Sequence, residues 1–169
     1  LLQRSWNQLS GRTMLDHYGM AISGSQLFDV NSERVLVWTN LNQISSFQSA
    51  DFALGQDSLD ANESGSTLSG ASLAMMCAGG PWLFIVSGSR ILVLPSPSGG
   101  GGKNYPVHSV LDGVQGNVKW ADDNGSVYFY PNGLVYDAAA DALWISDYAN
   151  NRLLRIANPA STPRVNLVI

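Results

Sequence analysis

Few side chains in this sequence have a type and spacing that could support catalysis or metal binding. His17 and His108 are the only histidines, Cys77 is the only cysteine, and the three lie far apart along the chain. A zinc site needs three or four such ligands together, and a single cysteine cannot form an intrachain disulfide. We therefore expect both histidines to be structural or exposed, and Cys77 to be a small core residue.

Other patterns approach known motifs without completing them. Gly102-Lys103-Asn104 resembles the end of a phosphate-binding loop, but Pro97 replaces its first glycine and an asparagine its Ser or Thr. The segment Asp122-Asp123-Asn124-Gly125 lacks the spacing of a calcium loop and its terminal glutamate. The nucleophile elbow Gly-x-Ser-x-Gly is also missing from the sequence. The sequence thus predicts no catalytic residue, no metal ligands and no cofactor.

The elements that would position any site are short apolar runs, three of which follow an arginine. Arg34, Arg90 and Arg152 each precede such a run, at spacings of 56 and 62 positions. Asp29 and Asp147 stand five positions before the arginine of their unit. A carboxylate in such a turn accepts hydrogen bonds from turn amides, and asparagine tolerates left-handed backbone. We assign these residues to a structural turn motif without chemistry: Asp29, Arg34, Arg90, Asp147, Asn151 and Arg152.

Each unit contains further apolar runs that complete a set of four short strands. No window sustains the apolar spacing of a helix, and Gly or Pro interrupts the chain at short intervals. Four antiparallel strands in about 50–60 residues are typical of a propeller blade. We predict an all-β chain that is one partial β-propeller domain. Its three blades would span about 18–56, 67–115 and 117–169, preceded by residues 1–17.

Two segments outside these strands differ from them in composition. The segment from Pro95 to Tyr105 contains the run Gly99-Gly-Gly-Gly102, and we expect it to be a flexible excursion between blades. Residues 117–130 predict an extra hairpin with Asp123-Asn124-Gly125 at its tip. Its aromatic side chains either pack on the next blade, the favoured interpretation, or form a partner surface. The residues of that candidate surface are Trp120, Tyr128 and Tyr130.

With these residues in view, the chain resembles the NHL-repeat family of β-propellers. Its blades typically carry a Pro-x-Gly-Leu/Val start, then an Asp, a Leu-Tyr-Val-x-Asp strand, and Asn-x-Arg before an aliphatic run. The first unit matches at Asp29, Asn31 and Arg34, whereas the middle unit has only Ser87-Gly88-Ser89-Arg90 as its turn. Residues 50–57 look like the outer-strand signature of many bacterial members. The matches in the last unit are Pro131, Gly133, Asp137, Leu143, Trp144, Ile145, Asp147, Asn150, Asn151 and Arg152.

The resemblance implies a propeller that closes with about six blades, so three units would be an incomplete ring. The remaining blades of the same protein, or a second copy of the chain, would complete it. An open array exposes an edge strand and an apolar blade face, so we expect the chain alone to associate. Some family members are enzymes, such as the lyase acting on peptidyl-hydroxyglycine, which holds a metal with histidines from several blades. Others bind RNA through a basic face.

Composition helps to separate these functions. The net charge of −4 disfavours a nucleic-acid partner, and no apolar run approaches the roughly 18 residues of a membrane-spanning helix. We predict a non-enzymatic binding or scaffold module that presents loops to a protein or carbohydrate partner. The alternative is a propeller enzyme, a lyase or lactonase-like hydrolase, with a metal at the propeller axis. Residues outside this chain would supply part of the ligands of that metal. The low charge and abundant Ser, Asn and Gly weakly favour an extracellular or periplasmic location.

Overall fold

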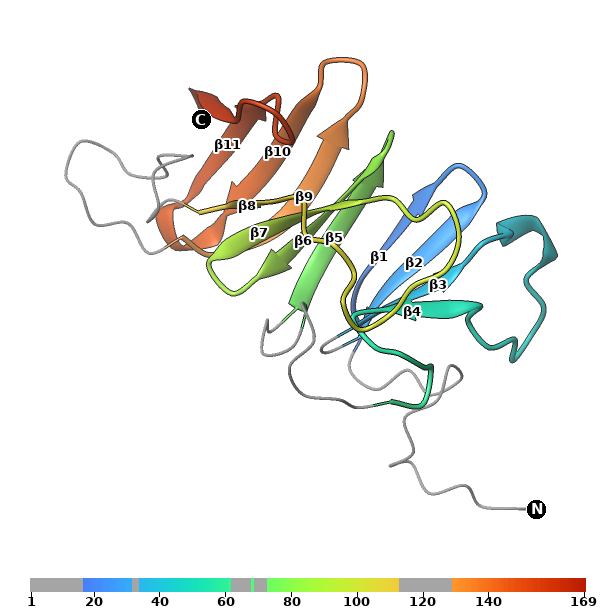
Figure 1. Cartoon of the computed structure of the whole chain (residues 1–169). Helices are drawn as coiled ribbons and strands as arrows, with labels where there is room; N and C mark the ends of the chain where they lie inside the picture. The colour runs from blue at the N-terminus through green and yellow to red at the C-terminus, as the bar shows by residue number, and fades with distance from the viewer. Residues whose placement is uncertain (1–16, 32–33, 62–67, 69–72, 113–128) are drawn as a thin grey trace. The chain divides into compact units, whose positions relative to one another are not determined.

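The computed structural model describes residues 17–31, 34–61, 68, 73–112 and 129–169 (Figure 1). Within these ranges the chain forms three four-stranded antiparallel sheets and two short 3₁₀ turns. The predicted all-β class with four-stranded blades is therefore confirmed. No helix in the described part is long and apolar enough to cross a membrane. The chain divides into two compact units. The first unit contains the first sheet and residues 97–105, and the second unit contains the second and third sheets.

The strands pair within each sheet in the order in which they occur along the chain. The first sheet consists of β1 (His17–Ser23), β2 (Gln26–Asn31), β3 (Arg34–Trp38) and β4 (Phe52–Leu54). The second consists of β5 (Leu73–Gly79), β6 (Trp82–Ser87), β7 (Arg90–Pro95) and β8 (Ser109–Leu111). The third consists of β9 (Pro131–Asp137), β10 (Ala142–Asp147), β11 (Arg152–Ala157) and β12 (Arg164–Val168). The 3₁₀ turns are η1 (Leu41–Gln43) and η2 (Tyr148–Asn150).

The turn between the second and third strand differs from sheet to sheet. In the second sheet Ser87 pairs directly with Arg90, so Gly88 and Ser89 form a two-residue hairpin turn. Gly88 has a φ of +59°, a left-handed conformation that glycine adopts without steric cost. In the third sheet the corresponding turn contains η2 and is longer. Of these two turns, the longer one has room for additional side-chain groups at the end of its sheet.

In the second unit, the second and third sheets pack face to face. Alternate residues of a strand point to the same face, and the register places Phe84 opposite Val93 and Leu143 opposite Ile156. Each fully buried aliphatic or aromatic side chain contributes about 1.5–3 kcal/mol, so this core is the main support of the unit. Its buried members are Phe84, Ile91, Val93, Leu111, Phe129, Leu143, Ile145, Leu154 and Ile156.

Tyr136 of β9 closes one edge of this core. Its ring lies 4.9 Å from that of Phe84, and its hydroxyl donates to Asp141 Oδ1 at 2.7 Å. A Cβ atom at Gly79 of β5 would come within 2.5 Å of the ring, so a side chain there would displace the tyrosine. Burial raises the pKa of the half-buried Cys77 thiol to about 12, although a backbone hydrogen bond from Tyr136 acts in the opposite direction. Cys77 is therefore a packed thiol and a poor nucleophile near neutral pH.

His108 joins the two sheets near β8. Its exposed ring lies 4.4 Å from the ring of Trp82, and its Nε2 is 2.8 Å from the carbonyl oxygen of Ala160. Ala160 belongs to the connection between β11 and β12 of the third sheet. The described contacts of His108 are therefore with an aromatic ring and a backbone carbonyl, and its structural role stays a prediction.

In the first unit, one face of the first sheet is covered by its own chain. The segment that follows β3 returns over this face and places Ala50 and Ile44 on it. Trp38 donates from Nε1 to the carbonyl oxygen of Gln48 at 3.4 Å, and Asp51 accepts from the Thr39 amide and hydroxyl at 2.7 and 2.6 Å. The buried core here consists of Leu36, Trp38, Ala50 and Ala53.

The glycine-rich segment was expected to be a flexible excursion, and this expectation was wrong. The connection between β7 and β8 pairs in parallel with β4, where Gly55 N donates to Gly102 O at 2.9 Å and Gly102 N to Ala53 O at 3.0 Å (Figure 1). Lys103 N also donates to Asp57 Oδ1 at 2.9 Å. We call residues 97–105 the strap. It satisfies backbone groups of β4 that the edge of a four-stranded sheet would otherwise expose.

Replacement of Gly101 by Ala should release the strap, because a Cβ atom there would lie 1.9 Å from the carbonyl oxygen of Ala53. We expect a loss of about 1–3 kcal/mol in the free energy of unfolding, the usual range for overpacking. Hydrogen exchange should also accelerate at the amides of Gly55 and Gly102. Ser98→Ala, at an exposed position of the strap, is the matched control. Unchanged exchange in Gly101→Ala would contradict the pairing.

Candidate functional site

The long turn of the third sheet, between β10 and β11, is built on one buried carboxylate. Asp147 ends β10, and its side chain has no exposure to solvent. The chain then makes η2 and passes through Asn151, whose left-handed backbone (φ 48°, ψ 48°) directs it into β11 at Arg152. Asparagine adopts this conformation at lower cost than most residues. Local sequence therefore determines where the turn reverses, and Asp147 holds its two sides together.

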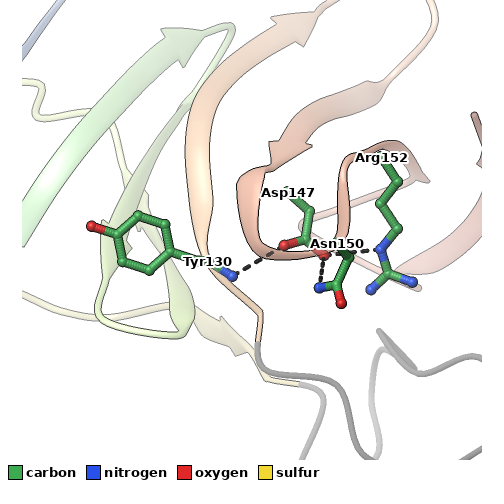
Figure 2. Close-up of polar contacts among 4 residues, drawn as sticks. All are labelled: Tyr130, Asp147, Asn150 and Arg152. Carbon is green, nitrogen blue, oxygen red and sulfur yellow. Dashed lines mark hydrogen bonds and ion pairs between the residues drawn. The ribbon is translucent and has the colours of Figure 1, made fainter.

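Three donors surround the Asp147 carboxylate (Figure 2). Oδ2 accepts from Arg152 Nε at 2.9 Å and from Asn150 Nδ2 at 2.6 Å, while Oδ1 accepts from the Tyr130 amide at 3.2 Å. The Tyr148 amide in turn donates to the carbonyl oxygen of Tyr130 at 2.9 Å. These bonds connect the turn to the chain that enters β9. The end of the sheet is therefore rigid, with the charges of Asp147 and Arg152 compensated.

The corresponding turn of the first sheet is arranged differently. Asn31 lies opposite Arg34 in the register, and Asp29, Asn31 and Arg34 are at most 3% exposed. Arg34 Nη1 donates to the carbonyl oxygen of Leu59. Burial lowers the pKa of Arg34, and the charges of Asp60 and Asp29 partly oppose this shift. Residues 32 and 33, at the tip of this turn, are outside the described part.

Arg90, the third arginine of the sequence motif, is exposed and lies at the end of the two-residue turn of the second sheet. It has no aspartate five positions before it. The structure thus gives the three arginines three different surroundings, and only Arg152 makes a described ion pair with the aspartate of its own motif. The proposed stabilising role of all six motif residues stays a prediction.

A cleft of about 370 Å³ opens beside the Asp147 turn. Its lining combines the Asp147–Arg152 pair with neutral amides and a hydroxyl, and with aromatic and aliphatic side chains. Sequence reasoning had singled out Asp147, Asn151 and Arg152 as turn residues but did not predict a cleft. Its lining residues are Asn132, Ser146, Asp147, Tyr148, Asn151, Arg152, Leu153 and Ile169.

Two tyrosines stand exposed at this end of the sheet. Tyr148 is 69% exposed and Tyr130 48%, and their rings meet edge to face at 6.3 Å. Tyr130 belongs to the partner surface predicted from the sequence, whereas Trp120 and Tyr128 of that surface lie outside the described residues. Tyr148 was missed, although its place in the turn directly after Asp147 could have indicated a surface position.

No group of three or more His, Cys, Asp or Glu side chains within the described ranges could hold a metal ion. His108 is engaged with Trp82 and Ala160, and Cys77 packs against the core of the second unit. The cleft itself presents hydrogen-bonding groups and apolar side chains among the described residues.

Comparison with known proteins identifies the fold. No protein-family model matches the sequence, and a search of curated proteins finds no match, so the NHL resemblance is not confirmed. The structure is similar to the periplasmic gluconolactonase PpgL of Pseudomonas aeruginosa, with a TM-score of 0.54 and 13% identity over 95% of this chain and 44% of that chain. It is also similar to AztD of Citrobacter koseri, with a TM-score of 0.50 and 14% identity over 90% of this chain and 33% of that one. Both are β-propeller proteins, and the chain spans less than half the length of either.

Replacing Arg152 by Ala should destabilise the protein, because the buried Asp147 carboxylate loses a charged donor while keeping its other two. We expect a decrease of about 1–3 kcal/mol in the free energy of unfolding, with a lower melting temperature. Arg164→Ala, on the exposed edge strand β12, should change stability by no more than about 0.5 kcal/mol. Thermal denaturation followed by circular dichroism measures both. Unchanged stability of Arg152→Ala, combined with lost ligand binding, would instead indicate a functional role for the arginine.

Proposed function

We propose that this chain belongs to a non-enzymatic binding module of β-propeller type, which engages a protein or carbohydrate partner at the end of its third sheet. The cleft beside the Asp147 turn is the observation that carries the proposal. Three of its polar residues, Asp147, Asn151 and Arg152, belong to a turn held by three hydrogen bonds, so little conformational entropy is lost there when a partner binds. Exposed tyrosines such as Tyr130 and Tyr148 combine a large apolar ring with a polar hydroxyl, which favours them at interfaces.

A glycan microarray tests this function, together with an assay for hydrolysis of glucono-δ-lactone. We expect selective binding to glycans, reduced by Tyr148→Ala, and no multiple-turnover hydrolysis with or without added divalent metal. Tyr18→Ala, at an exposed tyrosine of β1 outside the cleft, is the control. Binding of protein ligands in place of glycans would support the proposed binding module and would indicate a protein as its partner. Sustained hydrolysis would overturn the proposal.

The alternative is a lactonase-like propeller enzyme with a metal at the propeller axis. It is favoured by the likeness to a protein described as a gluconolactonase, at an identity of 13%. Sequence outside this chain would have to supply part of the metal ligands. The expected location remains extracellular or periplasmic, in line with the periplasmic description of the same neighbour.

We propose one further partner, a blade of the same protein that packs on the open face of the third sheet around its central row and leaves the cleft at the ends of the strands open. The register brings Val135, Trp144, Arg155 and Leu167 into one row across its four strands, with Val135 63% and Leu167 41% exposed. The Arg155 guanidinium lies over the Trp144 ring, 5.8 Å from its centroid. A further blade of the same protein is favoured over a second copy of the chain. The two propeller neighbours are each more than twice as long as the part of them that this chain matches.

Without such a blade, the chain should associate in solution, because the row leaves apolar side chains in contact with water. Light scattering of the purified chain should show species larger than 18.1 kDa. Replacing Val135 and Leu167 by Asp should reduce the association. A monodisperse monomer of the unmodified chain would contradict the proposed packing.

A further inference from the structure

We infer that the cleft beside the Asp147 turn binds a single neutral pyranose ring, and that its amides and Tyr148 recognise the sugar. This inference rests on the proposed function and names the ligand class of the same site. With a volume of about 370 Å³, the cleft is near the lower end of the range of about 300–1,000 Å³ typical of small-molecule sites. A sugar residue therefore suits it better than a large cofactor.

The charges of the cleft favour a neutral ligand. Arg152 Nε donates to Asp147 Oδ2 at 2.9 Å, so the only two charged side chains lining the cleft compensate each other. A carboxylate or phosphate ligand near the Arg152 guanidinium would also meet the negative charge of Asp147. An ammonium group near the buried carboxylate would meet the positive charge of Arg152, and would compete with Arg152 and Asn150 for Oδ2 (Figure 2). Because an ion of either sign meets a like charge beside its partner, a charged ligand is disfavoured.

The neutral polar groups of the cleft match sugar hydroxyls. Asn132 and Asn151 each present an amide with both donor and acceptor atoms, and a sugar hydroxyl likewise donates and accepts. Ser146 adds a hydroxyl from β10. It lies opposite Gly133 in the register, and a Cβ atom at Gly133 would come within 2.8 Å of Ser146 Oγ. The glycine of the Pro-x-Gly start thus leaves the space that this hydroxyl occupies.

Apolar surface on the cleft completes the match. Tyr148, Leu153 and Ile169 line it and are 69%, 45% and 66% exposed. A pyranose has one face made largely of C–H groups, which packs against aromatic and aliphatic side chains while its hydroxyls reach polar groups. The backbone of Leu153 pairs with Ile169 at 2.7 and 2.9 Å, so these apolar residues are held by the sheet itself.

The test is a titration of the full chain with methyl glycosides of glucose, galactose, mannose and N-acetylglucosamine, followed by NMR. Gluconate and glucosamine serve as the anionic and cationic comparison ligands. At least one neutral glycoside should bind in the millimolar range and shift the side-chain amide signals of Asn132 and Asn151. It should bind more tightly than either charged ligand. Tyr148→Ala should weaken binding about three- to tenfold, the value of one aromatic contact.

Tyr18→Ala should leave the affinity unchanged, and the dispersed NMR spectrum of each variant reports whether it is folded. Tighter binding of gluconate than of every neutral glycoside would overturn the inference, as would equal affinities of Tyr148→Ala and the unmodified chain. If no monosaccharide binds but a larger glycan or a protein still binds in a Tyr148-dependent way, the pyranose assignment fails and the binding module stands. If no ligand of either kind binds, both proposals fail.

Discussion

A carboxylate withdrawn from water loses its hydration and must be matched by donors from the protein. Asp147 is such a group, and the three donors that satisfy it come from different parts of the chain: the residue before β9, the 3₁₀ turn, and the first residue of β11. The same few bonds therefore determine where β9 starts, how β10 reverses into β11 and how charge is distributed beside the cleft. The geometry of the candidate site is a consequence of this desolvation requirement.

The three sheets show that one strand pattern tolerates several turn chemistries. The third sheet has an aspartate matched locally, and the second has only a glycine-dependent two-residue reversal. The first sheet keeps Asp29 and Arg34, yet its arginine donates to a backbone carbonyl of a later loop. Strand pairing and core packing define the repeated unit, whereas the turns are free to differ. This freedom allows the turn of a single sheet to become longer than the others, as in the third sheet beside the cleft.

The strands could be predicted from the sequence because short apolar runs with period-2 alternation are local signals, bounded by Gly, Asp and Asn. Consecutive strands usually pair with each other, so the four-stranded units were also predictable. The strap could not be predicted, because the pairing of Gly102 with β4 joins segments that are distant in sequence. The glycine-rich composition of the strap by itself indicates only flexibility. The cleft was missed for a similar reason. Tyr148, Asn132 and Ile169 become neighbours only after β9, β10 and β12 have paired.

The strap also constrains the order in which the chain can acquire its structure. During synthesis, residues 17–54 contain every strand of the first sheet, yet the backbone partner of β4 is made only after β5, β6 and β7. The first sheet therefore has an open hydrogen-bonding edge while much of the second is emerging from the ribosome. Such an edge is a template for mispairing, and long-range closure of this kind is slow compared with hairpin formation. A repeat protein assembled from local hairpins thus contains one step that cannot proceed strictly from the N-terminus to the C-terminus.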